Sequence, residues 1–262
     1  MIITLSPSKG QDFATPAPAP GYIYTLPDQL EESQLLINEV KKLDIKDLCE
    51  LMAVSENIAG LNVQRFKQWH IPFTTENAKA AFFAFTGDAY SAIEKEKYDQ
   101  NDLAYAQAHL RILSGLYGTL RPLDLIQPYR LEMKTRLENP RGDNLYQFWG
   151  DRITQKLNEI LEEQSEKVLI NLASHEYFKS VKPKILNGRL LNITFTESKE
   201  GKSQVIAIFA KRARGMMTDF ILRNRLEHAE DIKSFKKGGY SYSVKDSSDN
   251  NWFFTRPQPA QK

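Results

Sequence analysis

The chain has 262 residues, of which 41% are hydrophobic and 26% charged, and this composition is typical of a globular protein with a substantial core. Its length allows one large domain or two small ones. A single cysteine, Cys49, excludes an intrachain disulfide and with it the secreted disulfide-rich class. The net charge of +2 is nearly balanced, so any anion-binding role must come from a local cluster of Lys and Arg.

The first residues, MIITLSPSKGQDF, lack the basic region and the long apolar region of a signal peptide. No run of residues approaches the roughly 18 consecutive apolar residues of a membrane-spanning helix. We therefore expect a cytoplasmic protein that does not enter a membrane. We also expect a monomer.

The N-terminal part of the chain predicts one strand followed by helices. Residues 1–5 have strand-like composition and run into a turn at Ser6–Gly10. Residues 14–22 are rich in Pro and Ala, which predicts an extended surface loop. Apolar residues then recur at helical spacing behind capping residues, which predicts three helices, at 28–43, after Asp44 and from near Ser55.

The rest of the chain mixes strand-like and helix-like patterns. The apolar run at 80–85 suits a buried strand, with a helix as the alternative. The other expected strands are 167–172, 189–196, 205–209, 240–244 and 252–255. The other expected helices are 89–93 behind Asp88, 102–113, 145–161, 174–181 and 213–226. Because the pattern lacks a regular βαβ alternation, it predicts a mixed α/β (α+β) fold in a single compact domain over residues 1–262.

The segment from Ser114 to Lys134 is the strongest candidate for a functional region. Its sequence, SGLYGTLRPLDLIQPYRLEMK, combines turn-forming Gly and Pro with charge and has no clear period. Long charged loops in compact domains are usually functional. The alternative is an internal salt-bridge network that braces an irregular loop. The residues of interest are Ser114, Gly115, Gly118, Arg121, Asp124, Arg130, Glu132 and Lys134.

Two shorter segments follow predicted strands and have anion-binding features. Ser6–Gly10 offers hydroxyls, a lysine ammonium and a glycine N–H, which is a weak signal by itself. Residues 171–181 pass from strand to helix with Ser174 as the candidate N-cap, so this helix start is a potential anion site. The acid–base candidates that follow it directly are Glu176 and Tyr177.

A basic cluster of Lys211, Arg212 and Arg214 lies around the start of the helix expected at 213–226. The helix dipole disfavours positive charge at a helix start. The cluster therefore indicates a bound anion, such as a phosphate or a carboxylate. The alternative is a solvated basic helix start.

Metal and cofactor sites have little support in the sequence. The four histidines are widely separated, and there is no Cys pair, no Gly-x-Gly-x-x-Gly motif and no P-loop. We therefore expect no cofactor and no metal centre built from His or Cys, and direct iron sequestration is the weakest hypothesis. A site for Mg²⁺ or iron made of carboxylates stays open.

Taken together, eight strings resemble the YaaA family of bacterial peroxide stress proteins, and the resemblance covers nearly the whole chain. They are SPSK (6–9), FTGDAY (85–90), SGLYGTLRPLD (114–124), PYRLEM (128–133), NLYQFWGD (144–151), NLASHEYF (171–178), KRARGMM (211–217) and FKKGGYSY (235–242). The resemblance implies a cytosolic protein that limits intracellular iron and oxidative DNA damage under hydrogen peroxide. It also implies a mixed α/β fold of unusual topology with a positively charged cleft, a helix-hairpin-helix-like element and binding to double-stranded DNA.

On this resemblance, the hairpin is Ser114–Arg121. A typical helix-hairpin-helix has one residue between its two glycines, whereas two residues separate Gly115 from Gly118. Pro122 and Pro128 would also interrupt the second helix. The matching basic positions are Lys9, Arg121, Arg130, Lys211 and Arg214.

Two functional hypotheses follow. The first is a stress protein that binds the phosphates of double-stranded DNA. Its anion-binding residues would be Lys9, Ser114, Gly115, Gly118, Arg121, Arg130, Ser174, Lys211 and Arg214. The second is an enzyme that acts on a phosphorylated or carboxylated small molecule, such as a nucleotide, in the same cleft. Its acid–base residues would be Asp124, Glu132, Glu176 and Tyr177.

Overall fold

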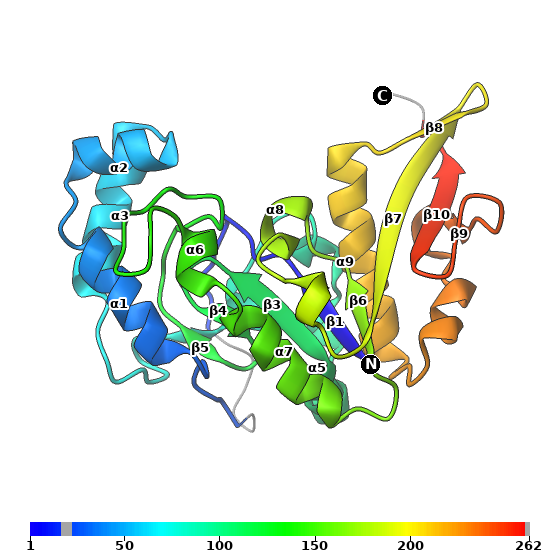
Figure 1. Cartoon of the computed structure of the whole chain (residues 1–262), viewed down its shortest axis with the longest axis horizontal. Coiled ribbons are helices and arrows are strands. Elements are labelled where there is room, and N and C mark those ends of the chain that lie inside the picture. The colour runs from blue at the N-terminus through cyan, green and yellow to red at the C-terminus, as the bar shows by residue number, and fades with distance from the viewer. Residues whose placement is uncertain (17–22, 260–262) are drawn as a thin grey trace.

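The computed structural model describes residues 1–16 and 23–259, and most of the loop predicted at 14–22 lies outside these residues. Figure 1 shows a twisted sheet in the middle of the molecule with helices packed around it. Within the described residues the sheet has eight strands. They are β1 (Ile2–Leu5), β3 (Leu110–Ser114), β4 (Gly118–Leu120), β6 (Val168–Asn171), β7 (Arg189–Lys199), β8 (Lys202–Gln204), β9 (Ser241–Tyr242) and β10 (Asn251–Pro257).

The interior of this sheet is parallel. The strand order is β4-β3-β1-β6-β7-β10-β9, and β8 pairs with β7. The five strands from β3 to β10 run in one direction, whereas β4, β8 and β9 are antiparallel to their neighbours. A separate small pair joins β2 (Lys79–Ala80) to β5 (Leu125–Ile126). The expected mixed α/β class is thus confirmed. The sequence pattern does not indicate that the sheet is mostly parallel, because the segments that connect its parallel strands are long and varied.

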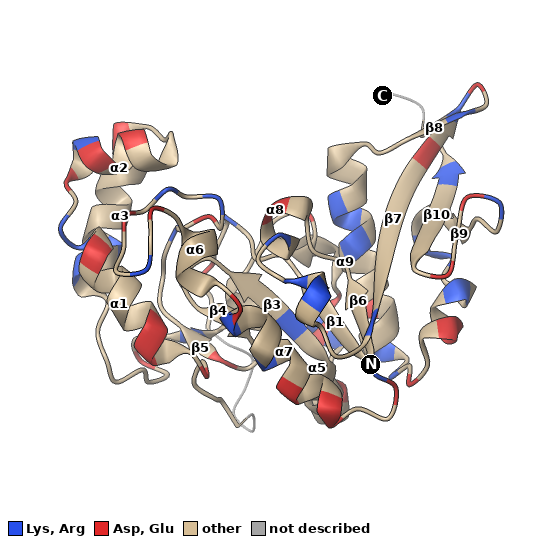
Figure 2. Cartoon of the chain, viewed as in Figure 1, with Lys and Arg blue, Asp and Glu red and all other residues tan. Residues whose placement is uncertain are grey.

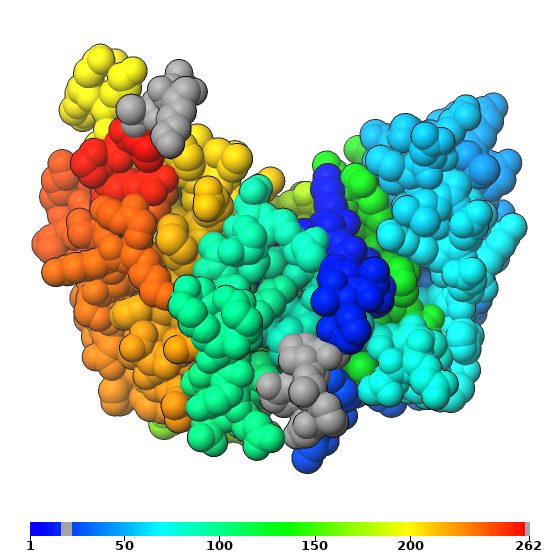
Figure 3. Space-filling model, turned by 180° about the vertical axis from the view of Figure 1, so that it is seen from behind, coloured from blue at the N-terminus to red at the C-terminus, as the bar shows by residue number. Residues whose placement is uncertain are grey.

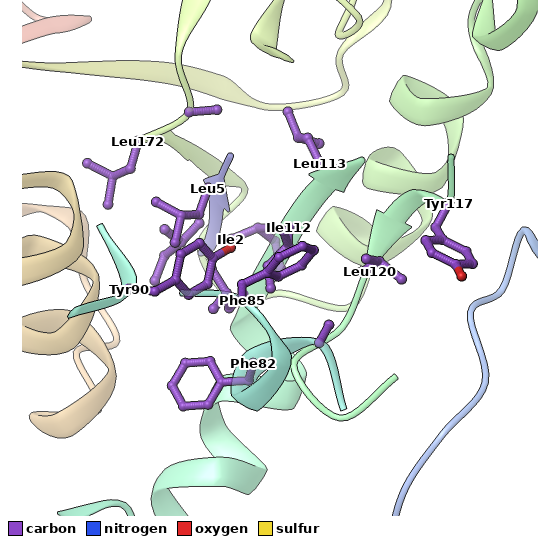
Figure 4. Close-up of a cluster of buried hydrophobic side chains, with 14 of the residues drawn as sticks. Ile2, Leu5, Phe82, Phe85, Tyr90, Ile112, Leu113, Tyr117, Leu120 and Leu172 are labelled. Carbon is purple, nitrogen blue, oxygen red and sulfur yellow. The ribbon is translucent and has the colours of Figure 1, made fainter. Parts of the chain in front are cut away.

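The core is organised around β1, because this strand lies between β3 and β6 and is buried along its whole length. A strand covered on both faces needs apolar residues at every position, and IITL has only one polar side chain. The Thr4 hydroxyl donates a hydrogen bond to the Ile170 carbonyl. Figure 4 shows β1 and β3 side chains near the aromatic rings of Phe82, Phe85 and Tyr90.

Helices α1 (Leu30–Val40), α2 (Ile45–Met52) and α3 (Glu56–Gln68) lie together at one end of the molecule, far from β7 and β10 (Figure 1). Helix α2 starts after Asp44, as the sequence predicts, and Asp44 forms a capping box with Asp47. The remaining α-helices are α4 (Ala81–Ala84), α5 (Gln100–His109), α6 (Leu145–Trp149), α7 (Arg152–Glu162), α8 (His175–Phe178) and α9 (Ala207–Arg223). Short 3₁₀ helices are η1 (Tyr90–Ala92), η2 (Lys95–Lys97), η3 (Pro183–Ile185), η4 (Ala229–Ser234) and η5 (Lys237–Gly239).

Four of the predicted elements are wrong in part. Residues 110–113, expected to end a helix, form strand β3, since a strand buried on both faces has the same continuous apolar composition. The run at 80–85 contains helix α4, which was the alternative. The helix expected at 145–161 divides at Gly150, whose φ is +52°. The strand expected at 205–209 lies earlier in the chain, as β8 at Lys202–Gln204, and residues from Ala207 onward form helix α9.

Candidate functional site

A crevice lies where the connections of the parallel sheet diverge. From β1 the chain leads to β3 on one side, and from β6 it leads to β7 on the other. In open α/β sheets, ligands bind outside the carboxyl ends of the strands at such a switch point. The loops that follow β1 and β6 are joined there, because the Ser174 N–H donates to Ser6 Oγ at 2.8 Å and the Ser6 hydroxyl donates to Ser174 Oγ at 3.2 Å.

A cavity of about 520 Å³ occupies this crevice. Its floor includes apolar side chains at the ends of the two strands, Leu5 and Leu172, with Tyr90 beside them. Figure 3 shows the molecule hollowed between the region of α1–α3 and the end formed by β8–β10, with N-terminal residues in blue reaching the hollow. The walls come from five segments, namely Ser6–Lys9, Gly87–Tyr90, Glu132 with Lys134, Ser174–Tyr177, and Lys211 with Arg214.

Glu132 is the centre of an ion-pair cluster on one wall. Its carboxylate lies 2.9 Å from Lys9 Nζ, 3.2 Å from Arg130 Nη2 and 3.5 Å from Lys134 Nζ. Its side chain is only 10% exposed. Burial raises the pKa of Glu132, but the hydrogen bond and charge of Lys9, the charge of Lys134 and the hydrogen bond of Arg130 outweigh burial and leave the pKa below its ordinary value. Glu132 is therefore a carboxylate at neutral pH.

Helix α9 forms the facing wall, and Gly215 lets it come close. A Cβ at this position would lie 1.8 Å from the Ala89 carbonyl oxygen, so only glycine permits the contact. Lys211 and Arg214 line the cavity, whereas Arg212 on the same helix does not. Figure 2 shows Lys and Arg gathered on the first half of α9. Because α9 begins at Ala207, these cations lie beyond its first turn, and the inference of a bound anion from an unfavourable helix start is wrong.

The two α9 cations that line the cavity have no partner among the described residues, whereas Arg223 at the end of the helix pairs with Asp102. Within residues 1–16 and 23–259, neither the Lys211 ammonium nor the Arg214 guanidinium makes a hydrogen bond or ion pair with the protein. Arg214 is half-buried, and burial lowers the pKa of its guanidinium. A partly desolvated cation without a counter-ion is costly unless an anion is supplied from outside. The geometry of this wall therefore suits an anionic ligand.

Helix α8 supplies the remaining polar groups. Ser174 is its N-cap residue by backbone conformation, but its side chain makes no capping hydrogen bond. Glu176 accepts a hydrogen bond from the Lys134 N–H at 3.4 Å. Burial, followed by the charges of Tyr129, Glu176 and Glu132, raises the pKa of Tyr177 well above its ordinary value, so this phenol keeps its proton. An ionised carboxylate and a protonated phenol therefore line one cavity.

Arg121 and Asp124 lie elsewhere and brace a loop. The Asp124 carboxylate is buried and accepts hydrogen bonds from the Thr25 hydroxyl at 2.5 Å and from Arg121 N–H groups at 2.7 and 3.0 Å. Arg121 also pairs with Asp28 at 3.1 Å. Burial raises the pKa of Asp124, against the effect of its Thr25 and Arg121 partners. These two residues fit the salt-bridge alternative for the central segment.

The glycine hairpin is buried as well. Ser114 pairs with Gly118 across strands β3 and β4, so the segment is a β-hairpin flanked by strands and not a helix-hairpin-helix. Ser114 Oγ accepts hydrogen bonds from two turn N–H groups and lies 2.7 Å from the Tyr129 hydroxyl. A Cβ at Gly115 would lie 2.3 Å from the Leu131 carbonyl oxygen, and one at Gly118 would lie 2.2 Å from Gln29 Oε1. The glycines therefore serve close packing, and their position leaves no room for a phosphate.

The structure thus brings several predicted residues to one cavity and separates others from it. Arg130 does not line the main cavity but holds Glu132 in place. Sequence reasoning missed Asp88, Tyr90 and His175 on its walls, although Asp88 and Tyr90 lie in the FTGDAY string. The predicted residues that line the cavity are Ser6, Ser8, Lys9, Glu132, Lys134, Ser174, Glu176, Tyr177, Lys211 and Arg214.

No helix in the described part of the chain is long and apolar enough to cross a membrane. The same residues contain no group of three or more His, Cys, Asp or Glu side chains placed to hold a metal ion.

Comparison with known proteins adds the family. A family model described as peroxide stress protein YaaA matches residues 1–246. A UPF0246 protein of Shewanella loihica is 50% identical over 260 residues, which cover 99% of this chain and 100% of the relative. A UPF0246 protein of Psychromonas ingrahamii is 50% identical over 258 residues, which cover 98% of this chain and 100% of the relative. The chain therefore belongs to the family of peroxide stress proteins YaaA.

Proposed function

We propose that this peroxide stress protein works by binding a phosphate- or carboxylate-bearing ligand in the cavity at the sheet's switch point. The observation that carries the proposal is the unpaired, half-buried Arg214 guanidinium, with Lys211 beside it on the same wall. An arginine fork matches an anionic oxygen pair in shape and charge. Binding an anion there removes the cost of leaving the cation without a counter-ion.

The test compares two arginines of the same helix. Arg214→Gln and Arg212→Gln remove the same charge, but only Arg214 lines the cavity. Isothermal titration with inorganic phosphate, and with AMP as a larger phosphate ester, should give binding that is at least about tenfold weaker in the Arg214 variant, because a charged hydrogen bond is worth about 1.5–3 kcal/mol. Equal weakening of binding in both variants would mean that only the overall charge of the helix matters, and it would reject the site.

The same cavity has the groups needed for acid–base chemistry. Glu132 is held as a carboxylate and Tyr177 as a phenol, so one can take a proton and the other can donate one. If the protein is an enzyme acting on its anionic ligand, Glu132→Gln should bind the ligand but lose protection of cells against hydrogen peroxide. A complementation assay in cells lacking the gene checks this. Full protection by a folded Glu132→Gln variant would rule out Glu132 as a base.

Binding to double-stranded DNA is the second candidate, and exposed lysines at the rim of the cavity favour it. The side chains of Lys9 and Lys134 are 59% and 65% exposed, and Lys211 is exposed as well. These side chains, rather than the buried glycines of the hairpin, would contact phosphates. Duplex affinity should then fall steeply with salt, and each lysine-to-glutamine change should lower the slope by about one. Affinity that does not depend on salt would reject this reading.

At the level of the cell, we propose that the protein limits intracellular iron and oxidative DNA damage during peroxide stress. This role rests on family membership. Cells lacking the gene should show more chelatable iron and more DNA strand breaks after peroxide than cells carrying it. An Arg214→Gln gene should fail to restore both measures if the cavity is the working site, and full restoration would separate the cellular role from the cavity.

A further inference from the structure

The cavity has two polar walls that do not contact each other. On one wall, the Lys211 and Arg214 cations have no partner in the part of the chain that the structure describes. On the other, Lys9, Arg130 and Lys134 share the single carboxylate of Glu132, which offsets one of their three positive charges. In the described residues no hydrogen bond or ion pair joins Lys211 or Arg214 to Glu132 or Glu176. An incoming anion therefore meets no competing carboxylate at Lys211 and Arg214, whereas at the other wall it would share the cations with Glu132.

Glu176 needs hydrogen-bond donors from a ligand, whereas Lys211 and Arg214 need an anion. It lines the cavity next to Lys134, and its carboxylate accepts only one long hydrogen bond from a backbone N–H, at 3.4 Å, among the described residues. An ionised carboxylate accepts several hydrogen bonds, so most of this capacity is unused. A ligand that satisfies Glu176 must present N–H or O–H donors.

The surface between the walls is apolar and partly aromatic. Pro7 is half-buried there, and Leu5, Leu172 and Tyr90 line the cavity with side chains that are at most 2% exposed. The Tyr90 ring is fixed because its hydroxyl donates to the Ser6 carbonyl at 2.9 Å. Such a surface favours a flat, weakly polar ring system. The cavity volume of about 520 Å³ is within the range of small-molecule sites and is far too large for a phosphate ion alone.

From these three features we infer that the cavity takes a nucleotide unit. The phosphate binds Lys211 and Arg214, the base lies against the apolar lining at Pro7, and an amino group of the base donates to Glu176. The inference rests on the proposed anion site and adds the class of ligand. The same chemistry is offered by a free nucleotide and by the 5′-terminal nucleotide of a DNA strand, which the hollow in Figure 3 leaves room to approach.

The test measures how the parts of the ligand contribute, by isothermal titration of the full chain with inorganic phosphate, ribose 5-phosphate, adenosine and AMP. We expect AMP to bind at least about tenfold more tightly than either fragment, because ribose 5-phosphate lacks the base contact and adenosine lacks the charged phosphate contact. If ribose 5-phosphate binds as tightly as AMP, the nucleotide inference is overturned while the anion site stands. If no phosphate-bearing probe binds, both proposals fail.

Variants assign the two ends. Arg214→Gln should weaken AMP and ribose 5-phosphate alike, whereas Glu176→Ala should weaken AMP about tenfold and leave ribose 5-phosphate unchanged. Arg212→Gln and Glu163→Ala are matched controls, because both residues are exposed and lie outside the cavity. Circular dichroism checks that each variant folds. Equal losses for both ligands in Glu176→Ala would overturn the assignment of the base end.

A competition experiment separates the two sources. Labelled AMP is bound first, and duplex oligonucleotides with a 5′-phosphate or a 5′-hydroxyl are added at 0.15 M salt. Displacement by the phosphorylated duplex alone identifies a DNA end as a ligand, and displacement by neither identifies the free nucleotide. Equal displacement by both duplexes would mean that DNA covers the cavity without using its terminal phosphate, and this would overturn the DNA-end form of the inference.

Discussion

At the scale of single residues, Glu132 should make stability depend on pH. Burial raises its pKa, but Lys9, Lys134 and Arg130 outweigh burial and lower it overall. A carboxylate with a lowered pKa in the folded state stabilises the fold above its unfolded pKa of about 4.3, and this contribution is lost as the pH falls through the folded pKa.

Glu132→Gln should therefore lower the free energy of unfolding by about 1–3 kcal/mol at pH 7, and the difference from the native chain should shrink below pH 4. Urea unfolding at pH 7 and at pH 3.5 measures both values. A difference of the same size at the two pH values would mean that the ion pairs of Glu132 contribute nothing to stability.

Arg214 is a half-buried residue of α9 and Lys237 is an exposed residue that pairs with that helix, and their substitutions should have opposite effects. Lys237 Nζ lies 2.6 Å from the fully buried carboxylate of Asp219, and removing this partly exposed lysine leaves a buried charge without its ion partner, which costs about 1–3 kcal/mol. Arg214 has no partner within the described chain, so Arg214→Met should leave the free energy of unfolding unchanged or raise it by about 1 kcal/mol.

Thermal unfolding of Lys237→Met and Arg214→Met checks the contrast. A binding residue that is kept at the expense of stability is expected at a functional site. A loss in Arg214→Met as large as that in Lys237→Met would show that Arg214 is part of the structural framework.

At the scale of elements, the approach of α9 to the loop at Ala89 positions the cationic wall. Gly215→Ala should lower the free energy of unfolding by about 1–3 kcal/mol, because its Cβ would overlap the Ala89 carbonyl oxygen at 1.8 Å. Gly60→Ala in α3 is the matched control, since its Cβ would meet only Ile45 Cδ1 at 3.7 Å.

The control should stabilise the protein by about 0.5–1 kcal/mol, because alanine is the better helix former. Chemical denaturation of both variants measures the difference. Stabilisation in both would mean that α9 can shift without cost, and the cavity wall would then not be fixed by Gly215.

Local sequence signals predicted the elements whose stability is local. The helix start after Asp44 is that of α2, and the apolar runs that form β1 and β6 are bounded by turn signals. Residues 110–113 were mistaken for helix because a buried central strand and a buried helix have the same apolar composition. Only the pairing with β1, more than 100 residues away in the chain, distinguishes the two.

The sequence predicts only part of the site, because contacts between distant segments decide which side chains reach the cavity. Residues that follow strands β1 and β6 were expected to lie at a ligand site, and both segments line the cavity. Arg121 and Glu132 belong to the same charged segment, yet only Glu132 lines the cavity, because Arg121 is held by Asp28 and Asp124. Which charges of one loop face a cavity is decided by tertiary partners, and the sequence does not encode them locally.

At the scale of the whole molecule, the topology predicts a single cooperative unit. Strand β1 pairs with β3 and with β6, so the central sheet needs residues from both halves of the chain. We expect one unfolding transition, with equal calorimetric and van't Hoff enthalpies, in differential scanning calorimetry. Two resolved transitions would show that the α1–α3 region or the β7–β10 region unfolds on its own.

The five segments that wall the cavity lie between residues 6 and 214, so the cavity exists only when most of the chain is folded. Ligand binding should therefore raise the stability of the whole fold. A molecule that binds only the folded chain adds about 2.7 kcal/mol to stability at a concentration one hundred times its Kd. For a domain of this size that corresponds to a rise in melting temperature of roughly 5–10 °C. Fractions of a cell extract can therefore be ranked by melting temperature alone, and the natural ligand can be isolated without knowing what reaction it undergoes.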